Sequence, residues 1–121
     1  MLEKAYAKVH GCYMAISGGH IAEALLALTG CPCFSLWLDD RALNLPTLWQ
    51  QLTRFKREGF PMGCGTSSDS SLRQVGLSAM HAYSILDCQE VQTAAGLAML
   101  LLVRNPHGMG EWTGPWSDAS A

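Results

Sequence analysis

Two apolar runs in the C-terminal third of the sequence place the strongest constraint on the fold. HAYSIL, at residues 81–86, alternates in part, and LAMLLLVR, at residues 97–104, is apolar on both of its faces. Such runs are typical of β-strands, and the second has the composition of a central strand that is covered on both sides. CQEVQTAAG, at residues 88–96, is predicted to be the hairpin connection between them. The two runs are therefore expected to be neighbouring antiparallel strands.

Helical spacing marks the N-terminal part of the sequence. Apolar residues recur at this spacing along residues 2–9 and again along residues 21–28. Gly30 follows the second stripe, and glycine is the usual residue at a left-handed helix cap. A third helix is expected to begin after Asn44 and to end near Glu58, because asparagine caps helices and a proline is tolerated in the first turn.

The remaining segments complete the fold class. CPCFSLWL, at residues 31–38, and FPMGCG, at residues 60–65, are short and apolar and are predicted to be strands. TSSDSS, at residues 66–71, has the composition of a loop. The sequence therefore predicts an α+β fold, with N-terminal helices followed by an antiparallel β-sheet.

Composition and charge exclude several classes of protein. The 121 residues suffice for one domain or a part of one, and 49% hydrophobic with 15% charged residues predict a folded chain with a buried core. The formal net charge is −2 and the basic residues are scattered, so nucleic acid is not an expected partner. The longest apolar stretch, residues 94–103, is shorter than the about 20 residues that a membrane span needs.

The N-terminal residues and the cysteines predict a reducing, intracellular location, which we take to be the cytoplasm. The first ten residues are amphipathic and charged from Glu3 onward, so they lack the apolar centre of a secretory signal. The cysteines are odd in number and unevenly spaced, and free buried thiols are expected. A zinc site made from Cys31 and Cys33 with His10 or Cys12 is the alternative, although the spacing differs from the usual zinc knuckle. The five cysteines are Cys12, Cys31, Cys33, Cys64 and Cys88.

His81 and Asn105 are the candidate catalytic residues. If the two apolar runs pair in antiparallel fashion, the start of the first lies beside the end of the second, and these side chains become neighbours. A carboxamide next to an imidazole fixes the orientation and tautomer of the ring, as in the Cys-His-Asn arrangement of papain-like proteases. The alternatives are a structural histidine at position 81 and a turn-forming Asn105 before Pro106.

Five motifs, LEKAYAKVHGCY, SGGHIAEALLALTG, HAYSIL, RNPHG and EWTGPWSD, occur in this order, and together they extend over nearly the whole chain, with residues 31–75 the least distinctive. In this order they resemble the protease core of the calpains, the intracellular calcium-dependent cysteine endopeptidases, and are most similar to the small-optic-lobes branch. The resemblance implies a papain-like core in two halves. Residues 1–30 would be the C-terminal helices of the nucleophile-bearing subdomain, and residues 31–121 the subdomain that carries His81 as general base and Asn105 as its partner, truncated at both ends.

Departures from the family pattern bear on activity. The nucleophile of the family lies in a Gln-Gly-x-x-Gly-Asp/Asn-Cys-Trp stretch, and no cysteine of this chain has such neighbours. The chain alone is therefore expected to be inactive. Calpains have Trp after the Asn-Pro pair, where this chain has His107, a smaller and more polar ring that would exclude less water; the alternative is that His107 only points to solvent. Met80, directly before His81, is a further departure.

The resemblance also implies calcium. The positions that match the acidic calcium ligands of the family are Glu111 and Asp118, and both offer hard oxygen ligands. Calcium needs six to eight oxygens, and the other ligands of the family lie beyond Ala121, so a partial site is expected. The alternative is that both are solvated turn carboxylates. Trp112 and Trp116 are expected to be core anchors beneath this loop.

These observations favour one function and leave two others open. The first is part of a calcium-dependent cysteine-type endopeptidase, which cleaves protein or peptide substrates when it is joined to the missing nucleophile-bearing half of the core. The alternative is a noncatalytic, truncated or degenerate calpain-like module that binds proteins. A third hypothesis is an adaptor that uses the apolar surface left exposed where the other half would lie.

Overall fold

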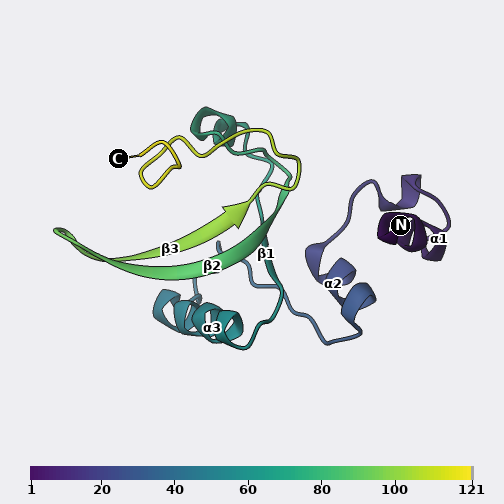
Figure 1. The fold of residues 1–121 in the computed structure, drawn as a ribbon, viewed down its shortest axis with the longest axis horizontal. Coiled ribbons are helices and arrows are strands. Elements are labelled where there is room, and N and C mark those ends of the chain that lie inside the picture. The colour runs from purple at the N-terminus through teal and green to yellow at the C-terminus, as the bar shows by residue number, and fades with distance from the viewer. Residues whose placement is uncertain (121) are drawn as a thin grey trace. The chain divides into compact units, whose positions relative to one another are not determined.

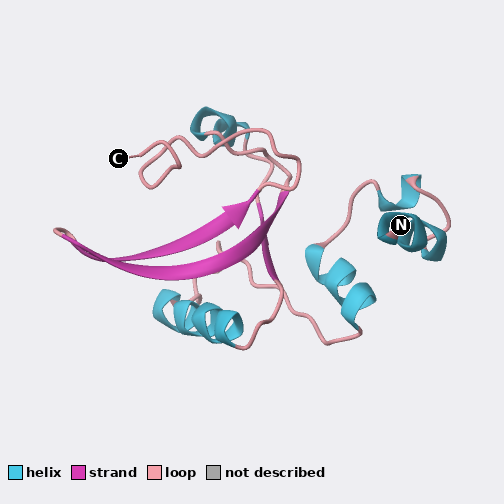
Figure 2. Ribbon diagram, viewed as in Figure 1, coloured by secondary structure: helices cyan, strands magenta, loops and turns pink. Residues whose placement is uncertain are grey.

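The order of elements is helices first and strands later, as the sequence predicts (Figures 1 and 2). The structure, a computed structural model, describes residues 1–120. The contacts divide the chain into two compact units, one ending at Leu36 and the other beginning at Trp37. The subdomain boundary expected after Gly30 stays a prediction, since the contacts change six residues later. The elements are α1 Leu2–Val9, η1 Met14–Ile16, α2 Ile21–Thr29, α3 Leu45–Arg57, β1 Met62–Gly65, η2 Ser70–Val75, β2 Ala82–Thr93 and β3 Gly96–Arg104.

The first unit contains α1, η1 and α2, and both predicted helices are confirmed. Ala7 lies on the apolar side of α1 and is buried. Gly30 ends α2 in the left-handed conformation, with φ of 70°, and its N–H donates to the carbonyl of Leu26 at 2.8 Å. Glycine at this position ends the helix without the steric cost that a side chain would bring.

The second unit contains α3 and the sheet. Asn44 caps α3 as expected, because its side-chain oxygen accepts a hydrogen bond from the N–H of Thr47 at 2.9 Å. The helix lies against β2, where Trp49 Nε1 donates to Glu90 Oε1 at 2.7 Å. Lys56 Nζ also donates to the carbonyl of Leu86 at 2.7 Å. These bonds hold the helix along one side of the sheet (Figure 1).

The sheet has three antiparallel strands in the order β1-β2-β3 (Figure 2). Residues 82–86 and 97–104 therefore belong to paired strands, as predicted, and His81 directly precedes β2. Ser84 lies opposite Arg104, so the first residues of β2 lie beside the last residues of β3. An irregularity between Ile85 and Asp87 inserts one residue into β2. This pairing brings the two ends of the hairpin segment together at one edge of the ladder.

The prediction of a strand at residues 31–38 is wrong. The segment has no helix or strand, and the three-stranded sheet includes no part of it among the described residues. A strand needs a neighbour for its backbone N–H and C=O groups, and Pro32 has no N–H to give. Trp37 and Leu38 are 70% and 71% exposed, so the apolar composition of this run reflects no burial within the chain.

The hairpin connection lies within residues 88–96, as predicted, but it is much shorter than this segment, because most of the segment is strand. Cys88 pairs with Leu101, and Thr93 pairs with Gly96, so only Ala94 and Ala95 connect the strands. The polar residues in this segment conceal a strand because one face of the hairpin is open to solvent. A short turn suffices, since Thr93 Oγ1 donates to the carbonyl of Gly96 at 2.8 Å.

Three further expectations differ from the structure. β3 pairs with β2 alone in the described part of the chain, so it is an edge strand rather than a central one. Within residues 1–120, only Ala7 and Tyr83 are almost fully buried, and the expected core is small. The predicted loop at residues 66–71 ends in a short helix, because Ser70 and Ser71 are the first residues of η2, which Asp69 caps. None of the described helices is long and apolar enough to cross a membrane.

Candidate active site

His81 and Asn105 lie side by side at one end of the β2–β3 strand pair. His81 directly precedes β2 and Asn105 directly follows β3, and the antiparallel pairing of these strands joins residues that are 24 positions apart. Nε2 of His81 lies 2.8 Å from Oδ1 of Asn105, and both side chains are half-buried. The proximity expected from the sequence is thus present, whereas the catalytic role of the two residues stays a prediction.

The other contacts of Asn105 assign the tautomer of His81. Nδ2 of Asn105 donates to the carbonyl of Met109 at 2.5 Å, and a carbonyl can only accept, so the amide nitrogen must point there. Oδ1 therefore faces His81 and accepts its Nε2–H. A neutral imidazole has only one N–H, which leaves Nδ1 with a free lone pair. This nitrogen is the one available to act as a base.

The backbone of His81 is held by Thr66, the residue after β1. The N–H of His81 donates to Thr66 Oγ1 at 3.0 Å, and the N–H of Thr66 donates to the carbonyl of His81 at 3.0 Å. The hydroxyl of Thr66 in turn donates to the carbonyl of Ser78 at 2.6 Å. One side chain therefore ties the end of β1 to both sides of the residue that carries the candidate base.

Two aromatic rings surround the imidazole of His81. Tyr83, which is 7% exposed, meets it edge-on with ring centroids 4.9 Å apart and an interplanar angle of 84°. The hydroxyl of Tyr83 accepts a hydrogen bond from the N–H of Ser78 at 2.9 Å. His107 contacts the other part of the ring, with centroids 4.6 Å apart and an angle of 54°. The rings restrict the rotation of His81.

His107 is therefore not a residue that only points to solvent. Its side chain is exposed, but its ring contacts His81, and its N–H donates to Oδ1 of Asn105 at 3.0 Å. The N–H of Gly108 donates to the carbonyl of Asn105 at 3.1 Å and closes a turn over residues 105–108, with Pro106 at its second position. Asn105 thus serves both as the first residue of a turn and as the partner of His81.

No cysteine is a hydrogen-bond partner of His81 among the described residues. Burial raises the pKa of the Cys64 thiol, and burial followed by the charge of Asp87 raises that of Cys88. A raised pKa opposes formation of the thiolate, which is the reactive form. All five cysteines are free, as expected, but the expectation that they are buried is wrong, because two are exposed and three are only half-buried. The zinc cluster considered for Cys31 and Cys33 is not assembled, because residues 1–120 bring no three His, Cys, Asp or Glu side chains into a metal-binding group.

Glu111 and Asp118 lie on the segment after the site and are exposed. The backbone of Glu111 packs closely on Gly76, where a Cβ would come 1.7 Å from the Glu111 carbonyl oxygen, and the φ of +81° at Gly76 also favours glycine. The described residues form no group of three or more potential metal-binding side chains, so two carboxylates alone do not fit the six to eight oxygens that calcium needs.

Trp112 and Trp116 are not buried among the described residues, so the expectation that they are core anchors is wrong. Trp112 is 38% exposed and Trp116 is 53% exposed. Trp112 Nε1 donates to the carbonyl of Pro115 at 2.7 Å, and its ring closely covers Gly114. The indole therefore stabilises its own turn, because the short segment offers no deeper apolar layer to receive it.

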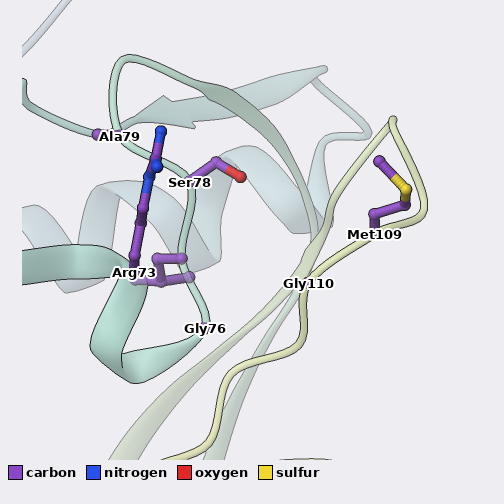
Figure 3. Close-up of a pocket in the computed structure, with 7 residues that line it drawn as sticks. Arg73, Gly76, Ser78, Ala79, Met109 and Gly110 are labelled. Atoms are coloured by element: carbon purple, nitrogen blue, oxygen red, sulfur yellow. The ribbon is translucent and has the colours of Figure 1, made fainter. Parts of the chain in front are cut away.

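A shallow pocket lies beside the His81–Asn105 pair, with a volume of about 370 Å³ (Figure 3). Ser78 and Ala79, just before Met80, line one part, and Met109, whose carbonyl accepts from Asn105, lines another. Neither His81 nor Asn105 lines it. The full lining is Arg73, Gly76, Leu77, Ser78, Ala79, Met109 and Gly110.

Thr66 and Tyr83 are the parts of the site that the sequence analysis missed. Tyr83 stands within HAYSIL, two positions after His81, and residues two apart in a strand share a face, so its contact with the ring could have been inferred. Thr66 lies in a stretch of small polar residues, and nothing in the sequence distinguishes it from the neighbouring serines.

Comparison with known proteins supports the family that the motifs suggested. The sequence model described as "Calpain family cysteine protease" matches residues 1–121. The "Calpain-type cysteine protease DEK1" of Arabidopsis thaliana is 42% identical over 99% of this chain. The "Calpain-2 catalytic subunit" of Mus musculus is 35% identical over 98% of it. The chain spans 6% of the length of the first protein and 17% of the second. Its placement near the small-optic-lobes branch stays a prediction, but the chain belongs to the calpain family of cysteine proteases.

Proposed function

We propose that the chain is the His/Asn-bearing part of the catalytic core of a calcium-dependent cysteine endopeptidase. The observation that carries this proposal is the contact of 2.8 Å between His81 Nε2 and Asn105 Oδ1, which leaves Nδ1 free. A base oriented in this way suits a thiol nucleophile placed on its Nδ1 side. The thiol would come from the nucleophile-bearing half of the core, the proposed partner, and not from the five cysteines present.

The chemistry of His81 follows from this geometry. Nδ1 takes the proton of the thiol, and the resulting imidazolium keeps its Nε2–H bond to Asn105 while the thiolate attacks the peptide carbonyl. His81 then returns the proton to the leaving amine as the C–N bond breaks and the acyl-enzyme forms. In the second half of the reaction His81 takes a proton from the water that attacks the thioester, and it returns this proton to the sulfur as the C–S bond breaks and the carboxylic acid product leaves. Asn105 holds the ring in one orientation throughout.

Calcium dependence and a cytoplasmic location are proposed from the resemblance to the family and from the sequence. Glu111 and Asp118 would supply carboxylate oxygens to a calcium ion whose remaining ligands come from other parts of the protein. No chemical step given above depends on that ion.

The test joins the chain to a nucleophile. Residues 1–121 replace the matched stretch of the calpain-2 catalytic subunit, and hydrolysis of casein is followed with calcium present. His81→Ala should lower kcat/KM by about 10³-fold, since general acid–base catalysis contributes roughly 10² to 10⁴. His20→Ala, an exposed histidine before α2, is the matched control and should retain full activity. The proposal is refuted if His81→Ala cleaves casein as fast as the parent chimera.

The noncatalytic binding module remains a second candidate because apolar side chains are exposed along β3. Leu97 is 57% exposed, Met99 is 48% and Leu101 is 40%, and these alternate residues lie on one face of the strand. Exposed apolar surface of this kind is typical of a surface that meets another protein. A chimera that folds but cleaves casein no faster than its own His81→Ala variant would favour this candidate over the protease.

A further inference from the structure

The residue before His81 has an unusual backbone conformation. Met80 has a φ of 50°, and only Trp116 shares a positive φ among the described non-glycine residues. The left-handed region is disfavoured for residues with a Cβ, which clashes there with the backbone. Such conformations persist where the surrounding structure imposes them, and they cluster at functional sites. The conformation of Met80 therefore calls for an explanation other than local preference.

Hydrogen bonds on both sides impose this conformation. The N–H of Met80 donates to the carbonyl of Ser67 at 2.9 Å, and the N–H of His81 donates to Thr66 Oγ1 at 3.0 Å. The carbonyl of Ser78 accepts from the hydroxyl of Thr66 at 2.6 Å. The loop after β1 thus holds the backbone over residues 78–81, and the direction in which the Met80 side chain leaves it is fixed.

The side chain of Met80 contributes little to the packing of this chain. It is 77% exposed, whereas the imidazole of His81 turns inward to Asn105. Stability alone would favour a glycine at this φ, because glycine adopts the left-handed region without strain. The fold therefore holds an apolar thioether in solvent at a position where a smaller residue would be easier to accommodate.

The position of Met80 relative to the proposed chemistry suggests its role. In the proposed reaction His81 gives a proton to the leaving amine, so the imidazole must come within about 3 Å of that nitrogen. The Cα atoms of Met80 and His81 are about 3.8 Å apart along the chain. The residue that carries the leaving amine, the first one after the scissile bond, would therefore lie near the backbone of residues 80–81, from which the exposed Met80 side chain extends.

We propose that Met80 determines specificity by contacting an apolar side chain on the first substrate residue after the scissile bond. The inference rests on the proposed protease function. Methionine is unbranched and polarizable, so it fits apolar side chains of different shape, and it offers no charge or strong hydrogen-bond acceptor to a polar one. A preference for large apolar residues over small polar ones is the expected result.

The test uses the calpain-2 chimera and two peptides that differ only in the residue after the scissile bond, leucine in one and serine in the other. The parent should cleave the leucine peptide with the higher kcat/KM. In Met80→Gly the leucine-to-serine ratio should fall by about fivefold, within the range of one lost apolar contact. Met80→Leu should keep the ratio, because it retains volume and apolar character.

Two controls separate the possible failures. Leu45→Ala removes an exposed apolar side chain from the start of α3 and should leave the ratio unchanged. The thermal midpoint of Met80→Gly should equal or exceed that of the parent, which excludes misfolding as the cause. A parent chimera without activity overturns the proposed function itself. A parent that cleaves, with the same ratio in Met80→Gly, overturns only the role of Met80.

Discussion

Removing one hydroxyl at the end of β1 should loosen the residue that carries the candidate base. Thr66→Val keeps the shape of the side chain but deletes the acceptor for the N–H of His81 and the donor to the carbonyl of Ser78. Both hydrogen bonds are half-buried, and each contributes about 1 kcal/mol to stability. The segment at residues 78–83 should therefore open more easily by about 2 kcal/mol, which corresponds to about 30-fold in the opening equilibrium.

Hydrogen–deuterium exchange of the calpain-2 chimera measures this change directly. Backbone amides in the peptide that covers residues 78–83 should exchange about 30-fold faster in Thr66→Val, while peptides from α3 stay unchanged. Thr66→Ser retains the hydroxyl and is the matched control. Activity on casein should fall together with protection, because the orientation of His81 depends on the same bonds. Unchanged protection at residues 78–83 in Thr66→Val would show that Thr66 does not hold His81.

Three further predictions concern neighbouring groups. Asn105→Ala should lower kcat/KM of the chimera by about 10²-fold through loss of ring orientation. Asn105→Asp should also impair it, because a carboxylate would face the Met109 carbonyl; equal activity of both variants and the parent would refute this role. His107→Trp should raise kcat/KM by about threefold, because a larger ring excludes more water from the hydrogen bond between His81 and Asn105. A loss of activity in this variant would contradict this reasoning. The pKa of Asp87 is lowered by hydrogen bonds to its carboxylate. The bond from Gln89 has the largest effect, followed by those from the N–H of Cys88 and from Lys56. Because this pKa is lower in the folded state than in the unfolded state, the ionised Asp87 stabilises the fold at pH values above the unfolded value of about 3.9. This stabilisation is lost as the pH falls through the lowered pKa of the folded state. The free energy of unfolding of Asp87→Asn, measured by urea titration, should therefore decrease less in acid than that of the parent.

The parts of the fold that could be predicted are those with local chemical signals. Asn44 marks the start of α3 through its own side-chain cap, and Gly30 marks the end of α2 through its conformational freedom. The prediction of a strand at residues 31–38 failed because an apolar run forms a strand only beside another strand. The run itself carries no information about whether such a neighbour is present. The length of the hairpin failed for the opposite reason, since polar residues on its open face resemble a loop.

The sequence predicted the His81–Asn105 pair of the candidate site, but not the residues that hold this pair in place. His81 and Asn105 follow from two recognisable runs and one antiparallel hairpin, which place them at the same edge of the sheet. Thr66 reaches His81 from a segment without periodicity, through a loop whose path depends on contacts far apart in the sequence. The ring contact of His107 with His81 depends on the geometry of the turn after Asn105. Asn105 and Pro106 indicate a turn, but they do not determine this geometry.

The turn at Ala94 and Ala95 lies at the opposite end of the hairpin from His81. β2 contains 12 residues, so roughly 40 Å of strand separates the two ends. Lengthening a surface loop costs little, about 0.6 kcal/mol for each doubling. A fluorophore or an affinity tag inserted between Ala94 and Ala95 should thus report on this protein without disturbing the His81–Asn105 pair, which makes the hairpin tip a practical handle for following the molecule in solution.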